Sequence, residues 1–205
     1  MQHILLFCSI VAIVWFAVIY FLPGMVMTVY KRAILVNGFG EGPVEINTLY
    51  TQSREQFADP LHSMGSRLTV TGVNRDTIIT IGWLDLCNGP LILHVPDMSD
   101  RYYSVQLTNP SKNTVIAYVG KRTTGAGAGA YIINGPGRKG GAAQGTAKDV
   151  PQQVASMQGA LRGAPQIRSP SNSILIIGRV LVYDRDDLPT AYNLSKQLRI
   201  SVMTN

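Results

Sequence analysis

The chain begins with a long apolar segment. Residues 4–22 (ILLFCSIVAIVWFAVIYFL) contain no charged side chain, and Lys31 and Arg32 supply the first positive charges. A helix rises about 1.5 Å per residue, so this segment approaches the hydrocarbon thickness of a bilayer, about 30 Å. The pattern therefore predicts a transmembrane anchor within residues 1–30, with the lipid bilayer as its partner through residues 4–22.

A cleaved signal peptide is the alternative for this segment. Such a peptide has a basic start, a shorter apolar core and a small-x-small cleavage site. This chain starts with MQHI and has no Ala-x-Ala after Leu22, so we expect an uncleaved, single-pass anchor. By the positive-inside bias, Lys31 and Arg32 would hold the following domain in the cytoplasm. This bias alone does not decide the orientation of the anchor, which is left open.

Short β-rich runs separated by turns make up the rest of the chain. Residues 31–66 show no regular pattern, and we assign them to a linker and cap in which VEINTLYTQSREQF is a short helix or an extended arm. Beyond them, Val, Ile, Tyr and Thr gather in runs bounded by Gly, Pro, Asn and Asp, which is typical of antiparallel strands. The predicted strands are Arg67–Thr71, Thr77–Leu86, Leu91–Val95, Tyr102–Thr108, Thr114–Val119, Tyr131–Asn134 and Ser173–Asp184.

The run YYSVQLTN alternates between apolar and polar positions. Tyr103, Val105 and Leu107 share one face, which is the period of a half-buried strand. With the regular spacing of turns, this pattern predicts an all-β, antiparallel sandwich over residues 67–205. A Gly/Ala-rich excursion interrupts it at about residues 135–165, and DDLPTAYNLSKQLRI predicts a short C-terminal surface helix.

Composition and charge narrow the classes of function. Charged residues make up 15% of the chain, against about a quarter of a soluble domain, which agrees with a membrane segment. The net charge of +6 suggests anionic partners, but the basic residues are scattered and do not alternate with aromatic ones, so we expect no specific nucleic-acid binding. Cys8 lies in the apolar segment and Cys87 has no second ligand at metal spacing. We therefore expect no disulfide, metal or cofactor.

Six motifs in order resemble one known family. They are GVNRDTIITIGWLDL, LILHVPDMSDRYYSVQLTNP, AYVGKRTTG, YIINGPG, IRSPSNSILIIGRVLV and DDLPTAYNLSKQLRI, and together they span about residues 72–200. They are similar to the signatures of the DUF1254 family, a domain of unknown function. The resemblance implies an immunoglobulin-like sandwich and an extracytoplasmic, periplasmic setting, but no established reaction. In many members a DUF1214 domain follows in the same chain, so this chain looks like a short, membrane-anchored form whose companion would be a separate polypeptide.

The triplet Asn74, Arg75 and Asp76 precedes the strand that carries Trp83. An ion pair between Arg75 and Asp76, with the Asn74 amide bonded to the backbone, would brace the entrance of that strand. As a catalytic site, the triplet would instead need a base, a nucleophile or a metal nearby. We favour the brace, and we expect Trp83 in the core.

Further polar candidates lie in LHVPDMSDRYY and VGKRTTGAGAGAY. His94 is expected on the strand face opposite Val95, as a hydrogen-bonded histidine rather than a metal ligand. Asp85 is expected to pair with Arg101 or Arg122 across the sheet. The glycines after Arg122 have the composition of a phosphate-binding loop but not its spacing, because the lysine precedes them.

Two classes of function stay open. The first is a non-enzymatic module, held at a membrane, that docks a partner protein or forms an oligomer. The second is an enzyme or a small-ligand protein for a carbohydrate or carboxylate. Its site would use Asn74, Arg75, Asp76, Trp83, His94 and Arg101, and the candidate cluster also includes Asp85 and Arg122. We favour the first class, because the sequence shows no convincing catalytic constellation.

Overall fold

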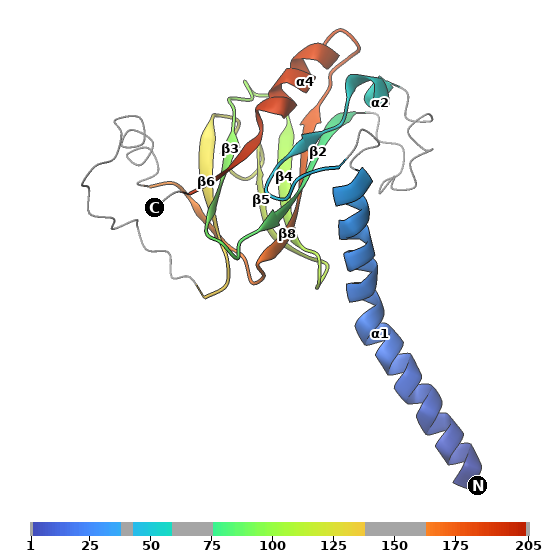
Figure 1. Cartoon of the computed structure of the whole chain (residues 1–205). Coiled ribbons are helices and arrows are strands. Elements are labelled where there is room, and N and C mark those ends of the chain that lie inside the picture. The colour runs from blue at the N-terminus through green and yellow to red at the C-terminus, as the bar shows by residue number, and fades with distance from the viewer. Residues whose placement is uncertain (1, 38–42, 59–75, 138–162, 204–205) are drawn as a thin grey trace.

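The computed structural model describes residues 2–37, 43–58, 76–137 and 163–203 (Figure 1). Its elements, in chain order, are α1 (Gln2–Asn37), β1 (Tyr50–Thr51), α2 (Arg54–Ala58), β2 (Thr77–Asp85), β3 (Leu91–Val95), β4 (Tyr103–Asn109), β5 (Thr114–Gly120), β6 (Gly129–Asn134), β7 (Gln166–Arg168), β8 (Ser173–Leu181), α4 (Leu188–Gln197) and β9 (Arg199–Val202). The predicted combination of an N-terminal apolar helix, a mostly β domain and a short C-terminal helix is confirmed.

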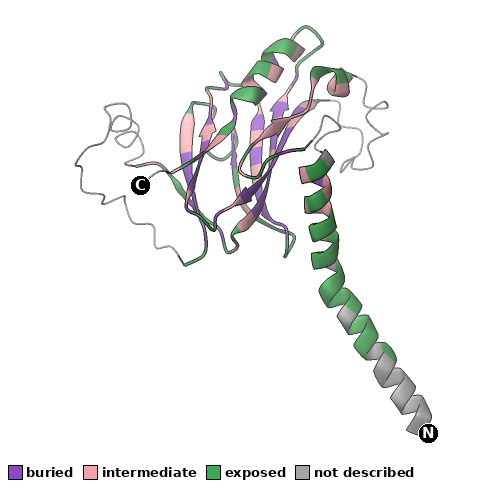
Figure 2. Ribbon diagram, viewed as in Figure 1, coloured by how far each residue is buried: buried purple, intermediate pink, exposed green. Residues whose placement is uncertain are grey.

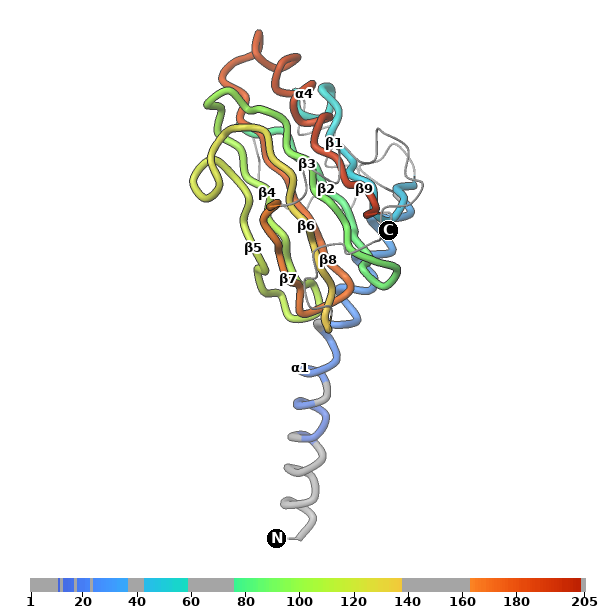
Figure 3. The backbone as a smooth tube through the Cα atoms, turned by 90° about the vertical axis from the view of Figure 1, so that its left-hand side faces the viewer, coloured from blue at the N-terminus to red at the C-terminus, as the bar shows by residue number. Residues whose placement is uncertain are grey.

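Helix α1 is a continuous rod whose free end points away from the domain (Figures 1 and 3). It runs through Pro23 and Gly24, where the sequence pattern is interrupted, and it ends at Asn37, beyond the anchor predicted for residues 1–30. Its described side chains are almost all exposed until the helix reaches the domain, as Figure 2 shows. The helix therefore has a free part and a part that meets the domain.

Two β-sheets form the domain. Sheet A has the strand order β1-β2-β8-β4-β5 and its strand pairs are antiparallel. Sheet B has the order β7-β6-β3-β9, and its β6–β7 pair is parallel. The purely antiparallel pattern expected from the sequence is therefore wrong at this pair. Parallel strands need a long connection, and the chain between Asn134 and Gln166 is long enough to supply one.

One apolar core fills the space between the two sheets. The predicted alternation in β4 is confirmed, because Tyr103, Val105 and Leu107 are each no more than 1% exposed. They belong to a single cluster that also takes residues from β2, β3, β6, β7, β8 and α4. Because burial of apolar surface is the main favourable term in folding, the shared core holds sheet A against sheet B.

The longer strands lie where the sequence predicts them, and the short ones were not predicted. The β3 prediction, Leu91–Val95, is confirmed to the residue. The predictions for β2, β4, β5, β6 and β8 also match, apart from differences at their ends. The predicted strand Arg67–Thr71 lies outside the described residues. Strands β1, β7 and β9 have only 2, 3 and 4 residues, too few to show an alternation.

Helix α4 lies across one end of the domain (Figure 1). Its fully buried residues are Ala191 and Ser195, and the Ser195 hydroxyl donates to the Ala191 carbonyl at 2.9 Å. Leu188 and Tyr192 are partly buried and pack against the core. The helix therefore closes the core at the end where several loops meet.

Candidate functional site

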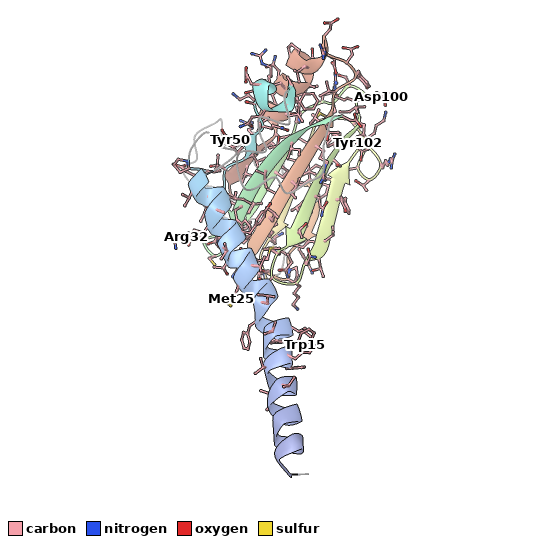
Figure 4. All side chains as sticks on the ribbon, turned by 90° about the vertical axis from the view of Figure 1, so that its right-hand side faces the viewer. Trp15, Met25, Arg32, Tyr50, Asp100 and Tyr102 are labelled. Atoms are coloured by element: carbon pink, nitrogen blue, oxygen red, sulfur yellow. The ribbon has the colours of Figure 1, made fainter. Side chains whose placement is uncertain are left out.

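The last turns of α1 pack on the outer face of sheet A. Ile81 and Trp83 of β2 point away from the core between the sheets, and Leu175 of β8 lies opposite Trp83 in the register. Ile34 of α1 covers them, and all four side chains are at most 7% exposed. Figure 4 shows α1 alongside the sheet, with Trp15 well outside the domain. Trp83 is therefore buried, as expected, but it lies in a cluster beneath α1 and not between the two sheets, because both faces of β2 are covered.

Two polar contacts hold the Trp83 ring in place. Its indole N–H donates to the Ser173 hydroxyl at 2.7 Å. The Lys31 ammonium lies 5.4 Å from the ring centroid, within the range of a cation–π interaction. Since Trp83 is 2% exposed, its ring cannot form the aromatic wall of a ligand pocket in this structure.

Asp85 is held by its own turn. Its Oδ1 accepts the Cys87 N–H at 2.9 Å, and its backbone N–H donates to the Asn47 side chain at 2.7 Å. Hydrogen bonds from Cys87 lower the pKa of Asp85. This arrangement is a common Asx turn. The predicted pairing of Asp85 with Arg101 or Arg122 is therefore wrong.

Arg101 instead clamps the turn between β3 and β4 to the start of α4. Its guanidinium donates to Asp187 at 2.5 and 2.6 Å and to the Leu181 carbonyl at 2.7 Å. It also lies 4.6 Å from the Tyr183 ring centroid. The hydrogen bonds from Arg101 hold the pKa of Asp187 below its ordinary value. At 7% exposed, Arg101 directs its donors into the protein, which is a structural role.

Arg122 lies at the same end of the domain. Its guanidinium is 5.4 Å from the Tyr102 ring centroid, and the neighbouring Lys121 pairs with Asp100 at 2.7 Å. Asp100 and Tyr102 lie at the end of the domain far from the free end of α1 (Figure 4). The glycines after Arg122 lead into strand β6, so they form no helix N-terminus of the kind that binds phosphate.

His94 lies on the outer face of sheet B, opposite Val95, as predicted. Its Nε2 is 2.8 Å from the Ser201 hydroxyl. Burial, and then the nearby charge of Arg199, lower the pKa of His94. Among the residues that the structure describes, no three His, Cys, Asp or Glu side chains gather as a metal site would require.

The triplet in front of β2 is only partly described. Asn74 and Arg75 lie outside the described residues, so the predicted brace stays a prediction for them. Asp76 is exposed, and its carbonyl accepts the Val182 N–H at 2.8 Å. This backbone bond ties the start of β2 to the end of β8.

The described candidates do not share one site. Trp83 and His94 lie on the outer faces of different sheets. Arg101 is committed to its clamp at α4. The single pocket that the small-ligand hypothesis requires is therefore not formed by the described members of the predicted cluster.

Most of the β domain matches one family. The model of DUF1254, whose description is "Protein of unknown function (DUF1254)", matches residues 52–202. The chain belongs to the DUF1254 family. A crystal structure of the VPA0106 protein from Vibrio parahaemolyticus is similar to this DUF1254 chain at a TM-score of 0.57 and 20% identity, over 86% of this chain and 35% of that one. This chain thus spans about a third of the length of that neighbour. No curated protein matches it.

Sequence reasoning missed the partners of three candidates in this DUF1254 chain. They are Asp187 for Arg101, Ser173 for Trp83 and Ser201 for His94, at separations of 86, 90 and 107 positions. Local patterns carry no signal for pairs so far apart. Asp187 lies in DDLPTAYNLSKQLRI, the segment that predicts a helix, and nothing in that segment points to Arg101.

Proposed function

We propose that this protein is a single-pass membrane module that holds a β domain at the bilayer surface and docks a partner protein there. The supporting observation is the exposure of α1. Among the described residues, Ile13–Val36 is the one helical segment long and apolar enough to span a membrane. Its most apolar stretch has a mean hydropathy of 1.9, and none of that stretch is buried against the domain. Trp15 and Phe16, 67% and 72% exposed, would otherwise face water.

The packing of α1 on sheet A supports a position close to the lipid. Because Ile34 is buried against sheet A, the helix from about Tyr30 onward stays with the domain and outside the hydrocarbon. Arg32, which is exposed, then falls at the lipid boundary, where basic side chains reach the headgroups, whereas Lys31 lies over the Trp83 ring. The domain would lie directly against the membrane without a spacer.

We also propose that the domain is an immunoglobulin-like sandwich, as the family resemblance implies. The support is the pair of sheets with a common core. The proposal concerns the sandwich architecture, because the sheet order β1-β2-β8-β4-β5 and the parallel β6–β7 pair differ from the ABED and CFG sheets of an immunoglobulin domain. An experimental structure of the full chain tests it. Two sheets packed face to face with strand directions within about 30° of each other are expected, and a closed barrel or sheets crossing at near right angles would contradict the proposal.

Membrane insertion is tested by placing charge on the free part of α1. A lysine in the middle of a membrane helix costs about 2.5–3.5 kcal/mol. We expect the unmodified chain to resist extraction by alkaline carbonate, and the double variant Phe16→Lys/Ile19→Lys to be extracted. The control Val115→Lys/Val202→Lys places the same charges on the domain and should stay in the membrane. Equal extraction of all three proteins would contradict the anchor.

The side of the membrane is tested by labelling Cys87. This thiol is exposed and free, and the variant Cys8→Ser leaves it as the one cysteine of the chain. An extracytoplasmic domain predicts that a membrane-impermeant maleimide labels Cys87 in intact cells. Labelling only after lysis would place the domain in the cytoplasm, as Lys31 and Arg32 favour.

Docking of a partner rests on two features. The match covers 35% of the VPA0106 chain, so a domain of this fold occurs there joined to much further polypeptide. On this chain, β5 is an end strand of sheet A. Its residues Val115 and Tyr118 are 45% and 49% exposed to solvent. An end strand with exposed apolar side chains can pair with another chain. We propose that a separate polypeptide, corresponding to that further part, docks along β5.

Affinity purification of the full chain from gently solubilised membranes tests this docking. We expect a stoichiometric partner similar in sequence to the part of VPA0106 outside the match. The variant Val115→Lys/Tyr118→Lys should lose most of it, whereas Val202→Lys, on sheet B, should retain it. Recovery of a lone monomer, or of an oligomer of this chain only, would contradict the proposed partner.

A further inference from the structure

We propose that a hollow on the outer face of sheet B binds a small organic carboxylate. The hollow has a volume of about 510 Å³, and its lining includes His94, Ala128, Gly129, Ala130, Gln197 and Arg199. Pockets for small molecules commonly have volumes of about 300–1,000 Å³. This site is separate from the predicted cluster, of which it contains only His94, and from the surfaces assigned to the membrane and the partner.

The register of sheet B explains why the face is hollow at this place. Ala130, His94 and Arg199 lie opposite one another across β6, β3 and β9. Residues paired in this way project to the same face, so all three point away from the core. Residues 128–130 are Ala, Gly and Ala, whereas histidine and arginine are long. The end of β6 is therefore a low floor, with His94 and Arg199 as walls.

The charge of the hollow is positive. Among the described residues that line it, Arg199 is the one with a formal charge, and no aspartate or glutamate is present. The ion pairs found between described residues do not involve Arg199. A guanidinium offers two parallel donors that match a carboxylate. Gln197, at the end of α4, adds an amide that can donate to the same anion.

His94 is held in a defined orientation beside this charge. Its Nε2 is hydrogen-bonded to the Ser201 hydroxyl. Ser201 lies two positions after Arg199 on β9, so both side chains point to the same face of the sheet. The other ring nitrogen, Nδ1, has no hydrogen-bond partner among the described residues. A neutral imidazole can donate or accept at that atom. The hollow therefore presents a fixed polar group next to a flexible cation.

The boundaries of the hollow suit a small organic molecule. One row further along the same face, Ile92 and Ile132 are buried, at 3% and 8% exposed, so the hollow is confined to the end of the sheet. Pro96 and Ala128 supply apolar surface for a carbon skeleton. A carboxylate attached to such a skeleton would use both the apolar wall and Arg199, whereas a bare inorganic anion would use only the charge.

Calorimetric titration of the full chain in a non-ionic detergent, with succinate as the probe, tests the site. We expect saturable binding that Arg199→Met weakens about tenfold or more, as is typical for the loss of a hydrogen bond to a charged group. The control Arg185→Met removes the same charge from an exposed position in the loop before α4, and it should bind as the unmodified chain does. Equal weakening by both variants, or no binding to the unmodified chain, would overturn the proposal.

Two further binding measurements distinguish a pocket from a surface that is only charged. Ala130→Leu fills the floor and keeps Arg199, so it should weaken succinate binding as strongly as Arg199→Met does. Inorganic phosphate should bind at least about tenfold more weakly than succinate, because it gains nothing from the apolar wall. Unchanged binding in Ala130→Leu, or equal affinity for phosphate, would show that a small organic carboxylate is the wrong ligand class.

Discussion

One row of side chains on the outer face of sheet A contrasts with one row on the outer face of sheet B. On sheet A, Trp83 lies in an apolar row, and Ile34 of α1 covers that row. On sheet B, the row that holds His94 and Arg199 beside Ala130 is left hollow. The same protein thus uses one face to seat its own helix and leaves part of the other face open.

This difference separates residues that stabilise the fold from residues available for binding. Apolar surface removed from water contributes about 25 cal/mol per Å², so the covered face should contribute strongly to the free energy of unfolding. A polar side chain at the edge of an open hollow contributes little to stability. Substitutions on the two faces should therefore have distinct consequences, and the predictions below follow from the largest expected effect on stability to the smallest.

Trp83→Ala should have the largest effect, because it empties the site beneath α1. Truncation of a buried tryptophan costs about 3–5 kcal/mol of unfolding free energy. Trp15→Ala is the matched control, since Trp15 is 67% exposed on the free part of α1 and should leave the domain unchanged. Urea titration of the full chain in detergent, followed by circular dichroism in the β region, measures both. Equal stability of the two variants would show that α1 does not cover sheet A.

Asp187→Asn should have the second largest effect, by opening the clamp at the end of the domain away from the free part of α1. Loss of the hydrogen-bonded pair with Arg101 should cost about 2–3 kcal/mol at pH 7. The folded pKa of Asp187 is below its ordinary value of 3.8. The contribution is therefore present above that value and is lost as the pH falls through the folded pKa.

Thermal unfolding at pH 7, 5, 4 and 3 measures this dependence. Below about pH 4, the unmodified chain should progressively lose its advantage in stability over the variant Asp187→Asn. Asp186→Asn is the control, because Asp186 is exposed on the same loop and should give the same acid dependence as the unmodified chain. A constant difference between Asp187→Asn and the unmodified chain down to pH 3 would contradict the role of this carboxylate.

Gly82→Ala, on β2 of sheet A, should have a moderate effect. A Cβ at this position would lie 2.6 Å from the Thr48 carbonyl oxygen and 2.7 Å from a methyl carbon of Leu49, so the segment before β1 must shift. Such overpacking costs about 1–3 kcal/mol. Gly127→Ala has open space around the new methyl group and should be neutral by the same urea titration. A neutral result for Gly82→Ala would mean that the segment before β1 yields without strain.

The fold could be predicted where one strand carries its own signal. The alternation around Val105 is enough to identify the inward face of β4, and the alternation within β3 places His94 on the face opposite Val95. Strand β2 is buried on both faces, so its apolar run shows that Trp83 is buried but not which element covers it. The cover comes from α1, and no local pattern connects Ile34 with a strand far along the chain.

The candidate sites were less predictable than the fold, because their geometry depends on partners that are distant in the sequence. Arg101 stood out as a charged residue beside a strand, but its role follows from Asp187. The hollow on sheet B depends on the absence of side-chain volume at residues 128–130, next to Arg199. Small residues in a glycine-rich stretch usually indicate a loop, so their contribution to a pocket becomes visible only when the strand register is known.

Arg199→Met gives the smallest expected change in stability and the sharpest test of the contrast between the two faces. Arg199 is exposed at the end strand of sheet B, and the ion pairs of the described residues do not include it. We expect its free energy of unfolding in the urea titration to stay within about 0.5 kcal/mol of the unmodified chain, as is usual for exposed positions. The same variant should lose succinate binding. A loss of stability of about 2 kcal/mol or more would instead make Arg199 a structural residue, and the two faces would then differ in composition but not in role.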